Sequence, residues 1–95
     1  MITLHISLTT KPGQGKALEA LYHEAYVPAI TRQAGFRSTA LMRAYDSETK
    51  YEIDISFGNE AQRQAWAEGA THAETWPQVT ALCDAVDAQG FDILA

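Results

Sequence analysis

The chain has 95 residues, of which 46% are hydrophobic and 20% charged, a composition typical of one globular domain rather than a disordered segment. A formal net charge of −5 with scattered Lys and Arg argues against a nucleic acid or an anionic membrane surface as partner. No apolar run reaches the ~18 residues of a membrane span, and no secretion signal opens the chain. The lone Cys83 cannot form an internal disulfide. We therefore expect one domain, residues 1–95, in the cytoplasm.

The first predicted elements are a strand and a long helix. Apolar and polar residues alternate over residues 2–9, which predicts a strand with one apolar face. Residues 10–15 contain Pro and Gly and predict a turn. Residues 16–34 carry apolar side chains at helical spacing, and Gly35 is expected to cap this helix. Pro28 lies inside it, removes one backbone N–H and predicts a kink.

Residues 35–57 predict a β-hairpin around a polar turn at residues 46–50. The second arm alternates between an apolar face with Tyr51, Ile53, Ile55 and Phe57 and a polar face with Glu52, Asp54 and Ser56. The first arm is apolar on both faces, with Phe36, Ala40, Met42 and Ala44 on one and Leu41 and Tyr45 on the other. A strand with two apolar faces must be covered on both, and one chain of this size has helices for only one. The pattern therefore predicts a homodimer.

Two helices and a short strand are predicted after the hairpin. Asn59 opens a capping-box pattern for a helix over residues 60–68. Thr71 opens a second such pattern, for a helix that runs to about Val86 and that its one proline would interrupt. Residues 91–94 then predict the last strand.

The resulting order, β-α-β-β-α(α)-β, predicts an α+β fold. Short connections and right-handed crossovers give a ferredoxin-like βαββαβ arrangement, a four-stranded antiparallel sheet with helices on one face. In that topology the first strand lies beside the second hairpin arm. His5 then faces Asp54 on the uncovered face, where it is a candidate interface histidine.

Several short motifs fail when their spacing is checked. Residues 12–17 resemble a phosphate-binding loop but lack the GxxxxGK[ST] spacing. His23 and Glu24 begin like HExxH, but position 27 is Val, so zinc would lose its second ligand. Cys83 lies on the apolar stripe of a predicted helix, where a thiolate is disfavoured. We therefore expect no metal site and no nucleophilic cysteine.

What remains is a cluster of ring side chains: Trp66, His72 and Trp76, with Tyr22 and Tyr26 on the facing helix. A pocket lined in this way would hold a flat aromatic ligand, with His72 as the group that takes or gives a proton near neutral pH. The alternative is that both tryptophans belong to the core and that His72 lies in solvent. Spacing alone favours this second interpretation.

Four landmarks occur in order along the chain: a strand leading to KPG, a helix with a late Pro that closes in AGF, a hairpin ending YEIDISF, and the segment NEAQRQAWAEGATHAETWPQV. In these landmarks the sequence resembles the antibiotic biosynthesis monooxygenase family over nearly the whole chain. The resemblance implies a dimeric α+β barrel, in which two sheets pack face to face. Each subunit of such a barrel keeps a ligand cavity between its sheet and its helices.

The resemblance also implies a reaction. Members of the family include enzymes that oxidise anthrones or quinols with molecular oxygen and no metal or flavin. Trp66 and His72 match positions where the family often carries these residues. The expectation is thus a cofactor-independent monooxygenase acting on a small polycyclic phenol, anthrone or quinol, with His72 as proton acceptor and Trp66, Trp76, Tyr22 and Tyr26 around the substrate.

Three alternatives accompany this expectation. The same fold serves a non-catalytic binding or dimerisation module, or an enzyme that isomerises or turns over a small metabolite. The haem-degrading branch of the family is also similar, but it places a haem-ligating histidine where this chain has Trp76. That branch also has an Asn that the first strand here lacks. We therefore expect no haem and no other cofactor.

Overall fold

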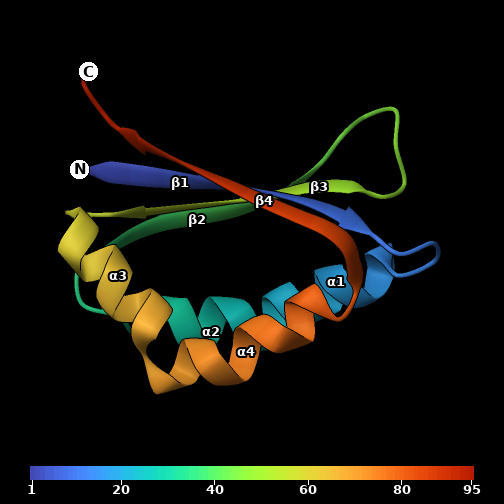
Figure 1. Cartoon of the computed structure of the whole chain (residues 1–95), viewed down its shortest axis with the longest axis horizontal. Helices are drawn as coiled ribbons and strands as arrows, with labels where there is room; N and C mark the ends of the chain where they lie inside the picture. The colour runs from blue at the N-terminus through green and yellow to red at the C-terminus, as the bar shows by residue number, and fades with distance from the viewer.

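The computed structural model describes residues 1–95 and shows a four-stranded antiparallel sheet lying on a layer of helices (Figure 1). In chain order the elements are β1 (Ile2–Thr10), α1 (Gly15–Leu21), η1 (Tyr22–Tyr26), α2 (Val27–Ile30), β2 (Phe36–Arg43), β3 (Lys50–Phe57), α3 (Glu60–Glu68), α4 (Ala70–Thr80) and β4 (Cys83–Asp92). The strand order is β2-β3-β1-β4. All helices lie on one face, and the other face is bare. The predicted α+β, ferredoxin-like fold is confirmed. No helix has the length and apolar character needed to cross a membrane.

Strand β3 shows the predicted alternation most clearly. Its inward side chains are almost fully buried, with Ile53 and Phe57 both 0% exposed. Its outward side chains include Asp54, which lies opposite His5 of β1 as predicted. Because side chains alternate along a strand, this one register fixes which residues of β1 face the helices.

Strand β2 departs from the predicted pattern at its start. Phe36 pairs with Phe57, but Ser38 pairs with the preceding residue, Ser56, so Arg37 is an extra residue in a β-bulge. The bulge turns Phe36 toward the helices, where its ring lies 6.1 Å from that of Phe57. The prediction that Phe36 shares a face with Ala40 is therefore wrong.

The first helix is shorter and less regular than predicted. It ends at Ile30 rather than near residue 34, and Thr31 rather than Gly35 is its C-terminal cap. The predicted kink takes the form of the π-helical turn η1, in which the Val27 N–H bonds to the Tyr22 carbonyl five residues earlier. Pro28 follows at once and cannot donate the next hydrogen bond, which explains why the irregular turn forms here.

The C-terminal third confirms one helix and corrects the other. Helix α3 has the predicted bounds, and the Asn59 side chain caps it by accepting a hydrogen bond of 2.9 Å from the Gln62 N–H. Helix α4 is capped at Gly69, not at Thr71, and continues through its proline to Thr80.

The prediction of a helix to about Val86 is wrong, and the last strand, predicted at residues 91–94, is present but with different bounds. The chain leaves α4 at Thr80, and β4 already begins at Cys83. Val86 pairs with Leu8, and the antiparallel pairing with β1 continues to Asp92. Residues 83–90 have weak intrinsic strand preference, so backbone pairing with β1 overrides the local helical pattern.

Candidate functional site

A cavity of about 350 Å³ lies between the sheet and helices α3 and α4. Nine of its 12 lining residues are hydrophobic. Its sheet side includes Leu4, Ile6, Ile55, Val86 and Ala88, and its helix side includes Tyr26, Trp66, His72 and Trp76. We call it the aromatic cavity. A small apolar enclosure with a few polar groups is the usual form of a small-molecule site.

The rings in the aromatic cavity are in mutual contact. The His72 imidazole stacks on Trp76, with centroids 5.7 Å apart and planes at 21°. The same imidazole meets Trp66 edge-on at 5.1 Å and 90°. Tyr26 lies 5.8 Å from Trp66 and 6.4 Å from Trp76. Aromatic packing of this kind holds the imidazole in one orientation. Four of the five predicted residues are thus brought together.

Tyr22, the fifth, does not line the aromatic cavity. It is 6% exposed and lies behind Tyr26, with the two rings stacked at 5.7 Å. Its hydroxyl donates a hydrogen bond of 3.1 Å to Thr39 Oγ1 on β2. Tyr22 and Tyr26 both belong to the π-helical turn η1 and are both buried. Only Tyr26 lines the aromatic cavity.

The turn between α3 and α4 sets the spacing of the cluster. Trp66 lies near the end of α3, and its carbonyl accepts a hydrogen bond of 3.2 Å from the Gly69 N–H. His72 falls in the first turn of α4, and Trp76 follows one helical turn later on the same face. The spacing of four between His72 and Trp76 is the sequence signal for their stacking.

The electrostatic environment keeps His72 neutral. Burial lowers the pKa of the imidazole below its usual value of 6.5, and the positive charge of Arg63 lowers it further. A neutral imidazole has a free nitrogen that accepts a proton. Burial raises the pKa of Tyr26, the nearby Tyr22 adds to this, and a hydrogen bond with Trp66 opposes it. Tyr26 therefore keeps its proton, and His72 is the available base.

Arg63 is a residue that the sequence analysis missed. It lies on α3, one turn before Trp66, and lines the aromatic cavity. Its Nε donates to both carboxylate oxygens of Glu60, at 2.8 and 3.0 Å. The sequence signal for Arg63 is its position three residues before Trp66, which places both side chains on one helix face. That signal does not distinguish a cavity-lining arginine from a solvent-exposed one.

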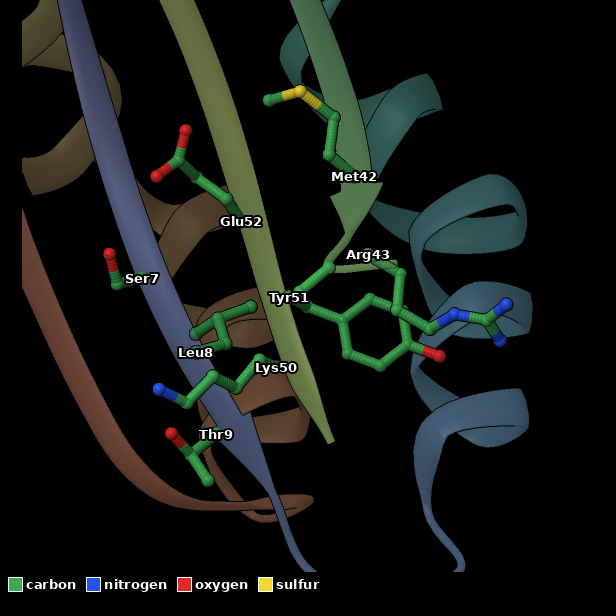
Figure 2. A pocket seen from close by; sticks show the side chains of 9 residues that line it. Ser7, Leu8, Thr9, Met42, Arg43, Lys50, Tyr51 and Glu52 are labelled. Carbon is green, nitrogen blue, oxygen red and sulfur yellow. The ribbon is translucent and has the colours of Figure 1, made fainter. Parts of the chain in front are cut away.

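Three other hollows are larger than the aromatic cavity, and none contains Trp66, His72 or Trp76. One, of about 420 Å³, lies on strands β1, β2 and β3. Figure 2 shows Ser7, Met42 and Glu52 beside it, from three different strands. Its one aromatic ring, Tyr51, is engaged through a hydrogen bond of 2.7 Å to Glu19. A second, of about 610 Å³, lies between β2 and the first helix, and Tyr22 is among its lining residues. The third, of about 430 Å³, lies at the hairpin turn.

A second titratable cluster lies on the helix-free face. His5 Nε2 is 3.7 Å from Asp54 Oδ2, and ligand atoms of His5, Glu52 and Asp54 lie within 4.8 Å of one another. A hydrogen bond with Asp54 raises the pKa of Glu52, and burial adds to this. These side chains could hold a cation, although such clusters are common without one. The sequence pattern predicted His5 opposite Asp54, with Glu52 on the same polar face, but did not predict that the three side chains form a cluster.

Fold and cavity together define an α+β ferredoxin-like domain with an aromatic pocket between its sheet and its helices. The chain belongs to the antibiotic biosynthesis monooxygenase family, whose sequence profile matches residues 1–77. The expected family is confirmed. The sequence matches no protein of curated function.

Solved structures show the same fold at low identity. SnoaB, a cofactor-independent oxygenase from Streptomyces nogalater, is similar with a TM-score of 0.89 and 16% identity, over 99% of this chain and 93% of that one. A protein of unknown function from Nitrosomonas europaea has a TM-score of 0.83 and 23% identity, over 99% and 89%. A Pseudomonas aeruginosa protein has a TM-score of 0.81 and 19% identity, over 99% and 94%. At these identities the likeness concerns the fold.

Proposed function

We propose that the protein is a cofactor-independent monooxygenase that oxidises a small polycyclic phenol, anthrone or quinol with molecular oxygen. The observation that carries this proposal is the imidazole of His72, held between Trp66 and Trp76 in an apolar cavity where burial lowers its pKa. Family membership and the structural similarity to the SnoaB oxygenase support it.

The proposed chemistry asks three things of the site. The rings of Trp66, Trp76 and Tyr26 bind a flat substrate. His72 accepts a proton from a phenolic oxygen or a ring methylene, and the electrons left on the substrate reduce molecular oxygen. For an anthrone, the methylene becomes a carbonyl as one oxygen atom enters and the other leaves as water. A positioned base contributes about 10²–10⁴-fold to such a proton transfer. The apolar walls protect the anion from competing reactions with water.

Oxygen uptake tests this proposal. The protein is supplied with a panel of anthrones and hydroquinones under metal chelation, and uptake is compared with that of His72→Ala and of the control His23→Ala. His23 is exposed on the first helix and does not line the aromatic cavity. We expect His72→Ala to lose about 10²–10⁴-fold in rate with little change in melting temperature. Full activity of His72→Ala would remove the proposed role.

A non-catalytic binding module is the second candidate. Apart from His72, the uncharged polar group at the cavity is the Tyr26 phenol, whose raised pKa makes it a poor proton acceptor. A site with His72 as its one proton acceptor is compatible with ligand binding alone as well as with catalysis. Binding of an aromatic ligand at Trp66 and Trp76 without any oxygen uptake would favour the module. Oxygen uptake that depends on His72 would exclude it.

We also propose a homodimer formed by the helix-free faces of two sheets. That face exposes apolar side chains, with Met42 42% and Phe91 47% exposed. At its centre, Asp54 Oδ1 is buried and lacks a hydrogen-bond partner, which a donor from a second copy would satisfy. Sedimentation should give twice the chain mass of 10.4 kDa, and Met42→Lys should give 10.4 kDa. A wild-type protein that is monomeric at micromolar concentration would contradict the dimer.

A further inference from the structure

Arg63 is held in place at the edge of the aromatic cavity. Besides its two Nε hydrogen bonds to Glu60, its Nη2 donates to Glu60 Oε1 at 2.5 Å, and its side chain is 21% exposed. The second terminal nitrogen, Nη1, has no hydrogen-bond partner in the chain. A carboxylate that is hydrogen-bonded to one edge of a guanidinium fixes the plane of the group, and the remaining N–H groups stay available to a ligand.

The free edge of Arg63 supplies the cavity's one side-chain charge. Asp87 also lines the cavity, but it lies on β4 between Val86 and Ala88, which face the helices. Its carboxylate accepts a hydrogen bond of 3.0 Å from the Ala88 N–H. Because side chains alternate along a strand, Asp87 belongs to the helix-free face and contributes mainly backbone to the cavity.

The cavity is therefore lined by a cation, one edge of which is paired with Glu60, in a chain that is otherwise acidic. The formal net charge is −5, but the charged side chain that faces the cavity is Arg63. Its charge is felt at His72, whose pKa it lowers. A half-buried cation acts more strongly on a ligand than one in bulk water, because less solvent screens it.

We propose that the aromatic cavity selects anionic aromatic ligands, with an ionised oxygen bound to Arg63 Nη1 and the ring between Trp66, Trp76 and His72. This inference rests on the proposed function and names its substrate class: acidic hydroxyaromatics or aromatic carboxylates. A hydroxyaromatic that enters protonated gives its proton to His72, and the resulting negative charge forms on the oxygen that Arg63 holds. Arg63 thus stabilises the deprotonated form.

The alternative is that Arg63 has a purely structural role. Its ion pair with Glu60, three residues earlier on the same helix, would then stabilise α3, by a modest amount. The two roles differ in their dependence on ligand charge. A structural arginine affects all ligands alike, through helix α3. An anion-binding arginine affects only the charged member of a pair of equal shape.

The test compares 2-naphthoate with 2-naphthamide at pH 7.5, by calorimetric titration. The amide has nearly the same shape as the carboxylate but no charge. The chain has two tryptophans, so the two indole N–H signals in an NMR spectrum report whether the ligand enters the aromatic cavity. Wild type, Arg63→Gln and the control Arg32→Gln are measured in parallel; Arg32 is exposed and does not line the cavity.

We expect wild type and Arg32→Gln to bind the carboxylate about 10- to 100-fold more tightly than the amide, as for a hydrogen bond to a charged group. Arg63→Gln should remove this preference and leave amide affinity unchanged. Equal binding of both ligands by wild type would overturn the role of Arg63 while leaving the cavity and the proposed oxygenase intact. An Arg63→Gln that weakens both ligands equally would overturn it too. Binding of neither ligand would overturn the cavity assignment, and both proposals with it.

Discussion

Strands β3 and β4 flank the same central strand, β1, but their environments differ. The inward side chains of β3 are sealed by the helices, and Ile53 is 0% exposed. The inward side chains of β4 are not, and Val86 is 41% exposed. Both strands pair antiparallel with β1, with a register shift only at the Thr9/Thr10 end of the β1–β4 pairing, so the difference comes mainly from where the helices lie.

The difference in exposure divides this small domain into a closely packed side and an open side. The side of β1 toward β3 contains the side chains with no exposed surface, which stabilise the fold. The side toward β4 contains the aromatic cavity, and His72 and Arg63 line this cavity from the helices. A site that must admit a ligand cannot be packed to the density of a core. This open side, toward β4, is less closely packed than the side toward β3, as a ligand-binding site would require.

The two tryptophans separate these environments most strongly. Trp66 is 2% exposed and belongs to the core as well as to the cavity wall, whereas Trp76 is only partly buried. Trp66→Ala should lower the free energy of unfolding by about 3–5 kcal/mol, out of a total of about 5–15 kcal/mol. Trp76→Ala should cost clearly less and should weaken binding of an aromatic ligand. Denaturant titration and ligand titration measure the two effects.

Equal stability losses in Trp66→Ala and Trp76→Ala would mean that Trp76 belongs to the core. The open side would then be more closely packed than its exposure indicates. Trp66→Phe is a useful companion, because it keeps an aromatic ring at the core position and should recover part of the lost stability.

Truncation of one inward residue on each flanking strand is the next test. Ile53→Ala removes a fully buried side chain from β3 and should cost about 2–5 kcal/mol. Val86→Ala removes a side chain from β4 that is already 41% exposed, and should cost less than about 1 kcal/mol. Both changes are followed by urea denaturation. A large loss for Val86→Ala would show that the inward face of β4 is covered in solution, in conflict with the 41% exposure of this side chain.

The sequence predicted the sealed side better than the open side. The strict alternation of residues 51–57 fixed the inward face of β3, because a strand with one buried face has one possible pattern. The first residues of β4, up to about Val86, were predicted as the end of a helix, because residues 83–90 contain Ala, Asp and Gln and only one β-branched residue. Its pairing with β1 is a long-range interaction that no local pattern reveals.

The site was predicted in part for the same reason. His72 and Trp76 are four residues apart on one helix, so their stacking could be inferred from spacing. The place of Tyr22 behind Tyr26 depends on the π-helical turn before Pro28, and a kink at proline does not by itself specify that turn. Whether His72 transfers a proton, and whether the protein is dimeric and cytoplasmic, stay predictions.

The cap of α3 provides a smaller test, because this helix carries both Trp66 and Arg63 over the cavity. Asn59→Ala removes the hydrogen bond from the Gln62 N–H and should lower the free energy of unfolding by about 1 kcal/mol. Asn59→Asp keeps an acceptor oxygen and should retain most of that stability. Thermal denaturation of the two variants decides the point. An Asn59→Asp protein as unstable as Asn59→Ala would show that the cap contributes through something other than this bond.

The smallest expected effect is the pH dependence contributed by His72, because solvent reaches its half-buried imidazole. Its pKa in the folded protein is lowered from 6.5, first by burial and then by Arg63. The unfolded chain therefore binds a proton at higher pH than the folded chain does. The stability associated with neutral His72 is fully present above pH 6.5 and is lost as the pH falls through the folded pKa.

Unfolding measured at several pH values for wild type and His72→Gln checks this sign. We expect wild type to lose stability relative to His72→Gln as the pH falls below 6.5. An NMR titration of the imidazole should give a pKa below 6.5 that rises in Arg63→Gln and stays lowered in part, because burial remains when the charge is removed. A pKa at or above 6.5 in wild type would mean that water fills the space around the ring. In that case the open side of β1 would be a solvent groove rather than an aromatic cavity, and the base would lose the environment that makes it one.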